Sequence, residues 1–407
     1  MPFFGLFSSL DREVRRALQG YWDSPAPGAR GRLLGLALWP WAWLYEAVHR
    51  VRRLLYRRGV LPRRRLPRPV VSVGALRVGG SGKTPFVLWM AERLQRQGYR
   101  VAILTRGYRG SAKQGTRILL GPNLPAASAE EAGDEPCLLA RSLPDVPVAV
   151  NRRRFEAGLA VLRSFPVDLF LMDDGFQHLE LARDCDLVLI GEEDPGRLAC
   201  LPRGPLREPA SALADASVVV RLTPAGVPAP ASPGAPARSQ GRGAAPAPVH
   251  RASLQAGPLC ALGGGSPVDP GLLRDRRVLA FCGIARPAYF WKLLAARGLR
   301  VEQRLAFPDH HVYSPGDCED LVRRLSSVDL AVTTEKDAVK IAGLAWPEGK
   351  VFFLRVEVVM EDEGTFWHQL ERTGVLGRGG PGRRPPEPQG ASSQGETLTT
   401  SANNRGC

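Results

Sequence analysis

The chain has 407 residues, of which 44% are hydrophobic, so it is long enough for about two domains with buried cores. Its formal net charge of +15 indicates an anionic partner, which is a phosphorylated substrate, an anionic membrane surface or nucleic acid. The seven cysteines are scattered and form no C-x-x-C pair, which argues against a disulfide framework and a zinc site and favours a reducing compartment.

Residues 1–69 form a first region that combines aromatic and basic side chains. An apolar run with three tryptophans occupies residues 33–48, and arginines flank it on both sides. The run is shorter than the roughly 20 apolar residues of a spanning helix, and Pro40 interrupts it. Tryptophan and tyrosine prefer the headgroup level, and clustered arginines prefer anionic lipid, so we expect an amphipathic helix on a membrane surface.

Two alternatives for this first region stay open from its composition. The helix could pack on the first domain and present a solvated basic face, or it could bind nucleic acid. The second alternative has less support, because no aromatic and basic platform on strands is evident. Acidic residues interrupt the first residues of the chain, so we expect no cleavable signal peptide.

Residues 70–222 alternate short apolar runs with helical patterns, which predicts an α/β domain around a doubly wound parallel sheet. The expected strands are residues 70–73, 101–104, 147–150, 167–172, 186–190 and 217–221. The expected helices are residues 84–97, 130–143, 152–164 and 209–214.

The first strand of this domain leads into a glycine-rich loop, VGGSGKT, that opens a helix. In a loop of this kind, backbone N–H groups surround phosphates, the lysine reaches the β- and γ-phosphates, and the hydroxyl residue holds Mg²⁺. The expected nucleotide contacts are Gly79, Gly80, Ser81, Gly82, Lys83 and Thr84. The strict phosphate-loop pattern has glycine at the position of Arg77, so a plain glycine-rich turn remains the alternative.

A carboxylate pair, Asp173 and Asp174, ends the apolar run LFLM, where doubly wound sheets bind their ligands. In a phosphate-loop protein, an acid at this position holds the Mg²⁺–nucleotide. Gln177 and His178 follow closely and are expected to reach the same cleft. The alternative is a pair of turn-forming aspartates before Gly175.

Two further segments carry groups suited to proton transfer or anion binding. Asp134 stands at an expected helix start, where a helix cap is the alternative to a catalytic role. His310 belongs to the segment FPDHHVY. Lys336 and Lys340 lie one helical turn apart after a predicted strand, as an anion site or as an ordinary charged helix start.

The remaining chain divides into three parts by composition. Residues 223–275 are rich in proline, alanine and glycine and are expected to be a linker or insertion. Residues 276–374 resume α/β patterning as a smaller second domain, and residues 375–407 are expected to be a disordered tail.

Nine motifs in this order resemble the tetraacyldisaccharide 4'-kinase family, which consists of membrane-associated phosphate-loop kinases of lipid A biosynthesis. The motifs are VGALRVGGSGKTP, LTRGYRG, GDEP, VAVNRRR, DDGFQH, LPRGPLRE, FCGIARP, FPDHHVYS and TTEKDAVK. They span residues 70–341 approximately, so the resemblance covers nearly all of both predicted domains.

The resemblance implies ATP- and Mg²⁺-dependent phosphorylation of the 4'-hydroxyl of an acylated glucosamine disaccharide 1-phosphate. It implies two Rossmann-like domains with parallel sheets, which close around the nucleotide. Asp134 would be the general base, oriented or tuned by His310 of the second domain, and Asp174 would complete the catalytic set. Thr84, Asp173 and Glu208 would lie at the metal, and Gln177 and His178 at the phosphates.

The resemblance also implies a location at the cytoplasmic face of the bacterial inner membrane, peripheral or monotopic, on an anionic surface. No nucleic acid and no obligate protein partner are expected. The family commonly has polar residues where this chain has Ala75 and Arg77. Two alternatives therefore remain: a soluble phosphate-loop NTPase of another class, and an inactive membrane-bound adaptor that keeps its nucleotide loop.

Overall fold

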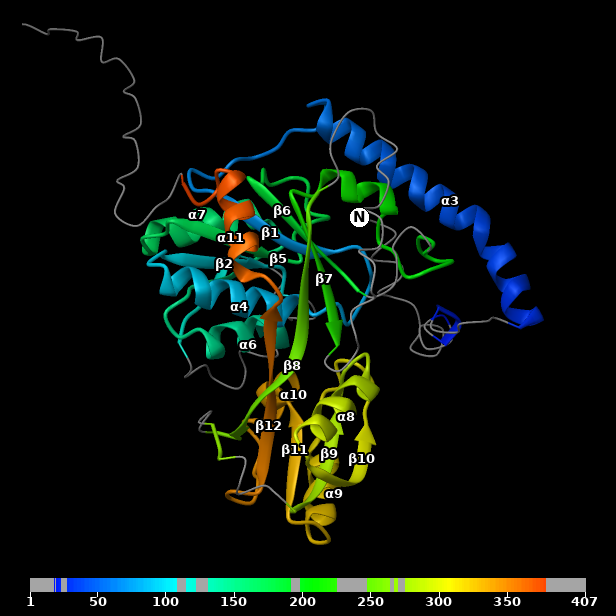
Figure 1. Cartoon of the computed structure of the whole chain (residues 1–407), viewed down its shortest axis with the longest axis vertical. Helices are drawn as coiled ribbons and strands as arrows, with labels where there is room; N and C mark the ends of the chain where they lie inside the picture. The colour runs from blue at the N-terminus through cyan, green and yellow to red at the C-terminus, as the bar shows by residue number, and fades with distance from the viewer. Residues whose placement is uncertain are drawn as a thin grey trace, which may run out of the picture.

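A single twelve-stranded sheet runs through the protein, in a computed structural model (Figure 1). The structure describes residues 18, 20–22, 28–107, 115–121, 131–191, 198–224, 247–263, 267–269 and 275–377. The order of strands across the sheet is β10-β9-β11-β12-β8-β7-β6-β1-β5-β2-β4-β3. All neighbouring pairs are parallel except β8 with β12 and β3 with β4, so the expected α/β class with parallel sheets is confirmed.

The bounds of the elements follow in chain order. The strands are β1 Val70–Ala75, β2 Val101–Thr105, β3 Arg117–Leu119, β4 Val148–Val150, β5 Leu169–Asp173, β6 Cys185–Ile190, β7 Val218–Pro224, β8 Val249–Ala261, β9 Arg277–Cys282, β10 Arg300–Ala306, β11 Leu330–Thr334 and β12 Val351–Met360. The helices are α3 Ala29–Arg57, α4 Lys83–Arg96, α6 Asp134–Ser142, α7 Arg154–Ser164, α8 Pro287–Ala296, α9 Pro315–Leu325, α10 Glu335–Ile341 and α11 Glu363–Arg372, with a 3₁₀ turn at Ala210–Asp215.

Helices cover both faces of the first half of the sheet. Successive strand residues point to opposite faces, so apolar residues at every position need a covering layer on each side. In β5, Leu169 and Leu171 pack with α4, α6 and α11, whereas Phe170 and Met172 pack against α7. Strands β1 and β5 are buried along their length on both faces, as their continuous apolar runs predicted.

The antiparallel pair β8 and β12 joins the two halves of the sheet, and Figure 1 shows both strands running from one half into the other. β8 also pairs in parallel with β7 of the first half, and β12 with β11 of the second. Residues 249–261 were expected to lie in a linker, and this expectation is wrong for them. Buried side chains alternate with less buried ones over residues 249–253 and 256–259, as in a strand with one face more covered than the other.

The predicted end of the second domain also needs correction. Phe366 and Leu370 of α11, with Val375 and Leu376 after it, are buried in the core of the first half. Phe366 packs edge-on against Phe86 of α4, with ring centroids 6.2 Å apart. The chain therefore returns to the first half after β12, so residues 363–376 do not belong to the second unit. The predicted tail beyond residue 377 and most of the proline-rich stretch lie outside the described residues.

Helix α3 is longer than the apolar run that predicted it and continues through Pro40. Its inner side packs on the first half of the sheet through Tyr45, His49 and Arg53, which are buried. Among the described helices, none is long and apolar enough to cross a membrane.

β1 lies between β5 and β6, so the chain after β1 emerges at the point where the strand order reverses. Doubly wound sheets bind ligands in the crevice at this point. Gly74 brings the end of β1 close to the loop after β5, since a Cβ at Gly74 would lie 2.4 Å from the Cβ of Phe176. The two predicted nucleotide motifs are thus packed directly against each other.

Candidate active site

The glycine-rich loop between β1 and α4 has the backbone of a phosphate cradle. Gly79, Gly80 and Gly82 have φ values of 71°, 49° and 69°, in the left-handed region that favours glycine. Gly82 directly precedes α4, so the unpaired N–H groups of the helix start face the loop. Lys83 Nζ lies 3.0 Å from Ser81 Oγ.

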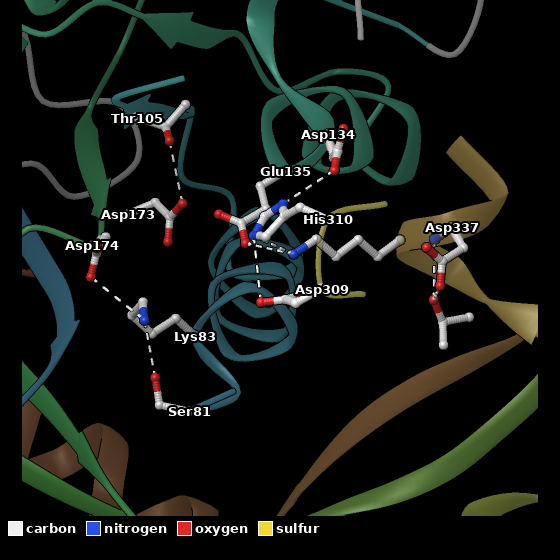
Figure 2. A network of polar contacts seen from close by, with 12 residues as sticks. Ser81, Lys83, Thr105, Asp134, Glu135, Asp173, Asp174, Asp309, His310 and Asp337 are labelled. Atoms are coloured by element: carbon white, nitrogen blue, oxygen red, sulfur yellow. Dashed lines mark hydrogen bonds and ion pairs between the residues drawn. The ribbon is translucent and has the colours of Figure 1, made fainter. Parts of the chain in front are cut away.

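Lys83 and Arg207 hold Asp174 between them at the end of β5. Lys83 Nζ is 3.6 Å from Asp174 Oδ1 (Figure 2). Arg207 Nη1 donates to Asp174 Oδ2 at 2.7 Å. Burial alone would raise the pKa of Asp174, but the two cations outweigh it and hold the pKa well below its usual range. Asp174 also has a φ of 51°, which is uncommon outside glycine and frequent at functional sites.

Asp173 has the opposite electrostatic character, although it is the adjacent residue. It is buried and accepts a hydrogen bond from Thr105 Oγ1 at 3.3 Å. Burial, followed by the charges of Glu135 and Asp174, raises the pKa of Asp173. The two carboxylates therefore point to different surroundings, as expected for adjacent residues at the end of a strand.

Both aspartates suit Mg²⁺ held together with a nucleotide. Asp173 Oδ1 and Asp174 Oδ1 are buried and have no hydrogen-bond partner in the described structure. Protein-only clusters of three or more metal-binding side chains are absent from the described residues. Mg²⁺ usually takes one or two carboxylates and completes its shell with water and substrate phosphates, so this donor set fits it.

Gln177 and His178 lie beside this centre in the loop after β5. Gln177 Nε2 donates to the carbonyl of Ala75 at 3.1 Å, and its buried Oε1 has no partner among the described residues. Burial, followed by several arginine charges of which Arg154 is the largest, lowers the pKa of His178 to about 3. These contacts favour the neutral form of the His178 ring, and its assignment to the phosphates stays a prediction.

Asp134 and His310 come from different halves of the molecule and meet at 3.3 Å, between Oδ2 and Nδ1 (Figure 2). Asp134 is the first residue of α6, and His310 lies in the loop after β10 with a φ of 57°. The His310 N–H donates to the carbonyl of Gly283, and the Gly283 N–H donates to Asp337 Oδ2 at 2.8 Å. Buried Asp337 thus fixes the main chain that carries His310.

Two lysines of α10 complete the surroundings of Asp134. Lys340 Nζ is 3.5 Å from Asp134 Oδ2, and Lys336 Nζ is 3.1 Å from His310 Nε2. Burial by itself raises the pKa of Asp134, but the His310 hydrogen bond and the charges of Lys340 and Lys336 outweigh it and lower the pKa. Asp134 is therefore ionised at neutral pH and can accept a proton.

Glu208 lies apart from the other predicted metal residues. It is 0% exposed and accepts hydrogen bonds from Arg53 of α3, with His49 Nδ1 3.6 Å away. Burial alone would raise the pKa of Glu208, but the His49 ring and the Arg53 guanidinium outweigh it and lower the pKa. In this structure Glu208 ties α3 to the loop before the 3₁₀ turn, and its assignment to the metal stays a prediction.

Three further residues belong to motifs identified in the sequence, but their contacts in the site were not predicted. Arg207 holds Asp174, Lys336 contacts His310, and buried Arg154 at the start of α7 acts on the pKa of both Asp173 and Asp174. Arg207 directly precedes a predicted metal residue, and Arg154 ends the motif VAVNRRR. Their signal in the sequence was membership of a motif, which gives no contact partner.

The second half of the sheet also reaches the phosphate loop itself. A Cβ placed at Gly80 would lie 3.5 Å from Arg286 Cδ, and one at Gly79 would lie 3.9 Å from Ala285 Cβ. Both residues belong to the predicted motif FCGIARP after β9. The loop therefore lies between the two halves of the sheet.

Comparison with known proteins agrees with this architecture. A family model described as tetraacyldisaccharide-1-P 4'-kinase matches residues 34–374. The chain belongs to this family. A tetraacyldisaccharide 4'-kinase of Pelobacter propionicus is 40% identical over 86% of this chain and 96% of its own length. A tetraacyldisaccharide 4'-kinase of Geobacter sulfurreducens is 39% identical over 79% of this chain and 90% of its own length.

A solved structure of a family member supports the same assignment. The crystal structure of LpxK from Aquifex aeolicus in complex with ATP has a TM-score of 0.67 and 32% sequence identity, over 84% of this chain and 99% of that chain. The resemblance inferred from the nine motifs is thus confirmed. The family assignment leaves a phosphate-loop NTPase of another class without support.

The burial of Glu208 generates a stability prediction. The change Arg53→Met leaves a fully buried carboxylate without its main partner, so we expect a loss of about 3–5 kcal/mol in the free energy of unfolding. Urea denaturation at neutral pH measures this change in the free energy of unfolding. The matched change Arg57→Met removes a half-exposed ion pair with Asp215 and should cost about 0–1 kcal/mol. Equal losses for the two variants would contradict a structural role for the Arg53–Glu208 pair.

Proposed function

We propose that this protein transfers the γ-phosphoryl group of ATP to the 4'-hydroxyl of a tetraacylated glucosamine disaccharide 1-phosphate, which gives the bis-phosphorylated lipid A precursor. The observation that carries the proposal is that a carboxylate–histidine pair and a phosphate loop both lie where the two halves of the molecule meet, in a chain of this family. A kinase needs both parts: a cradle for the donor and a base for the acceptor.

Lys83 and the backbone N–H groups of residues 79–84 would hold the phosphates of ATP. Lys83 is then drawn from Asp174 to the phosphates, which are the stronger anionic partner. Thr84, Asp173 and Asp174 would hold Mg²⁺, which neutralises charge on the phosphates when bound. Arg207 stays on Asp174 and keeps that carboxylate ionised and in place.

Asp134 would act as the general base. The acceptor oxygen forms a bond to the γ-phosphorus while the bond from that phosphorus to the β–γ bridging oxygen breaks, and ADP leaves. The hydroxyl proton passes to the Asp134 carboxylate. His310 donates to that carboxylate from the other half of the molecule, so the base is oriented only when the two halves are together.

Helix α3 would rest on an anionic membrane surface and bring the site to its lipid substrate. Its outward side carries exposed apolar residues, namely Leu33, Leu34, Leu36, Trp39, Trp41, Trp43, Leu44, Val48, Val51 and Leu54. Exposed apolar patches of this kind are typical of interaction sites, and the tryptophans and neighbouring arginines favour a lipid headgroup layer. The cytoplasmic face of the inner membrane is the location that this proposal requires.

A phosphotransfer assay tests the proposed reaction. Transfer of radiolabelled γ-phosphate from ATP to tetraacyldisaccharide 1-phosphate in detergent micelles should be robust for the wild type. The change Asp134→Asn should lower kcat about 10²- to 10⁴-fold, because it removes the base, with little change in KM for ATP. The matched change at exposed Asp145, Asp145→Asn, should leave kcat unaltered. A wild type that binds ATP and transfers nothing would instead support the inactive adaptor.

A vesicle assay tests the role of α3. The double change Trp41→Ser/Trp43→Ser removes two side chains that are 59% and 62% exposed, and each is worth about 1.5–3 kcal/mol when buried in an apolar phase. Co-sedimentation with phosphatidylglycerol vesicles should therefore weaken at least about tenfold and should decrease with added salt. The control Leu120→Ser/Val359→Ser removes exposed apolar residues elsewhere. If the control weakens binding as much, α3 is not the membrane contact.

A further inference from the structure

Lys336 occupies the junction between the two halves of the site. Its side chain projects from α10, at the carboxyl end of β11, and is mostly buried. The Nζ atom lies 3.1 Å from His310 Nε2 and 3.4 Å from Glu135 Oε1 of α6. One ammonium group thus contacts the histidine of the second half and the residue next to the predicted base in the first half.

The chemistry of these groups decides where the proton of the His310 ring lies. A lysine ammonium donates hydrogen bonds and accepts none, so His310 Nε2 accepts from Lys336. In a neutral imidazole the other nitrogen then carries the hydrogen, and Nδ1–H donates to Asp134 Oδ2 at 3.3 Å. This arrangement leaves the carboxylate as the proton acceptor of the pair.

We propose that Lys336 is a positioning residue that fixes His310 in the Nδ1–H tautomer and thereby directs the His310 hydrogen bond onto the base. The assignment of the tautomer stands on the contacts alone, whereas its consequence for catalysis rests on the proposed function. His310 then orients Asp134 and does not relay the proton, because the lysine occupies the only nitrogen that could take one. The abstracted proton stays on Asp134 during transfer.

Among the described residues, the titratable groups around the pair come from three elements. The α6 helix contributes Asp134, Glu135 and the thiol of Cys137, the loop after β10 contributes Asp309 and His310, and α10 contributes Lys336 and Lys340. Lys340 Nζ also lies 3.0 Å from Asp337 Oδ1, and Lys336 Nζ also contacts Glu135 Oε1. The charge of Lys336 is one of those that lower the pKa of Asp134. Its removal should therefore raise that pKa and move the acid limb of the rate profile to higher pH.

A purely structural role for Lys336 has different consequences. As a tether between α6 and α10, it would affect the stability of the closed arrangement and the KM for ATP. It would not set the tautomer of a histidine or the pH at which the base titrates. These two readouts therefore separate the positioning role from a tether.

The test combines ¹⁵N NMR of histidine-labelled protein with pH–rate profiles. The six histidines give few signals, and His310→Gln assigns the one of interest. The variants are Lys336→Met, which keeps most of the length of the side chain and removes its charge, and Lys336→Arg, which keeps a charged donor. Lys292→Met, at an exposed lysine of α8, is the matched control.

The expected result has four parts. Wild-type His310 carries its hydrogen on Nδ1. Lys336→Met gives a mixture of tautomers, lowers kcat up to about a hundredfold through misplacement of the base, and shifts the acid limb of kcat/KM to higher pH. Lys336→Arg restores the position of the limb and most of the Nδ1–H tautomer. Lys292→Met matches the wild type in each measurement.

Three results would overturn the inference: hydrogen on Nε2 in the wild type, an unchanged tautomer in folded Lys336→Met, or an unchanged acid limb in that variant. The wild-type spectrum and Lys336→Arg keep the test decisive if Lys336→Met does not fold. Failure of the proposed function has a different signature, since a wild type without phosphotransfer still reports its His310 tautomer.

Discussion

The antiparallel pairing of β8 with β12 is the constraint on which the site depends. One end of this ribbon is buried in the core of the first half, through Val358 and Met360, and the other end is buried in the second, through Leu259 and Leu354. On one side of this ribbon lie the strands of the first half, and on the other side lie the parallel strands of the second half. The ribbon joins them into a single sheet, and it thereby holds the loop that carries His310 within reach of α6.

The charge pattern of the site follows from that arrangement. The three lysines of the site each contact a carboxylate: Lys83 contacts Asp174, Lys340 contacts Asp337 and Lys336 contacts Glu135. Such pairs compensate buried or half-buried charges. The phosphates of ATP are a stronger partner for Lys83, so binding exchanges one ion pair for another. The overall excess of positive charge is concentrated in arginines elsewhere, and α3 and its neighbourhood take a large share of it.

Sequence patterns were sufficient for the elements that depend on local physics. The buried parallel strands appear as continuous apolar runs, and the phosphate loop appears as glycines that need left-handed backbone, so β1, β5 and Gly82 were all predictable. The order of motifs then placed Asp134 and His310 in one site, because the family resemblance supplied a pairing that spacing cannot give. Their separation of 176 positions in the chain carries no local signal.

The sequence did not predict features that depend on contacts between distant parts of the chain. The composition of residues 223–275 suggests a linker, yet Val249–Ala261 forms a strand because β7 and β12 provide neighbours on both sides. The contact between Glu208 and Arg53 of α3 is likewise not visible from the local sequence, and the assignment of Glu208 to the metal stays a prediction. For Val249–Ala261, tertiary contacts overrode a reasonable local pattern.

The central claim is that Asp134 and His310 act as one unit assembled from the two halves of the molecule. A double-mutant cycle on kcat/KM for phosphotransfer tests it directly, with Asp134→Asn, His310→Gln and the double variant. If the two residues form one unit, the double variant loses about as much as Asp134→Asn alone, because His310 has nothing left to orient. Losses that simply multiply would mean that the two residues act independently, and they would contradict the account.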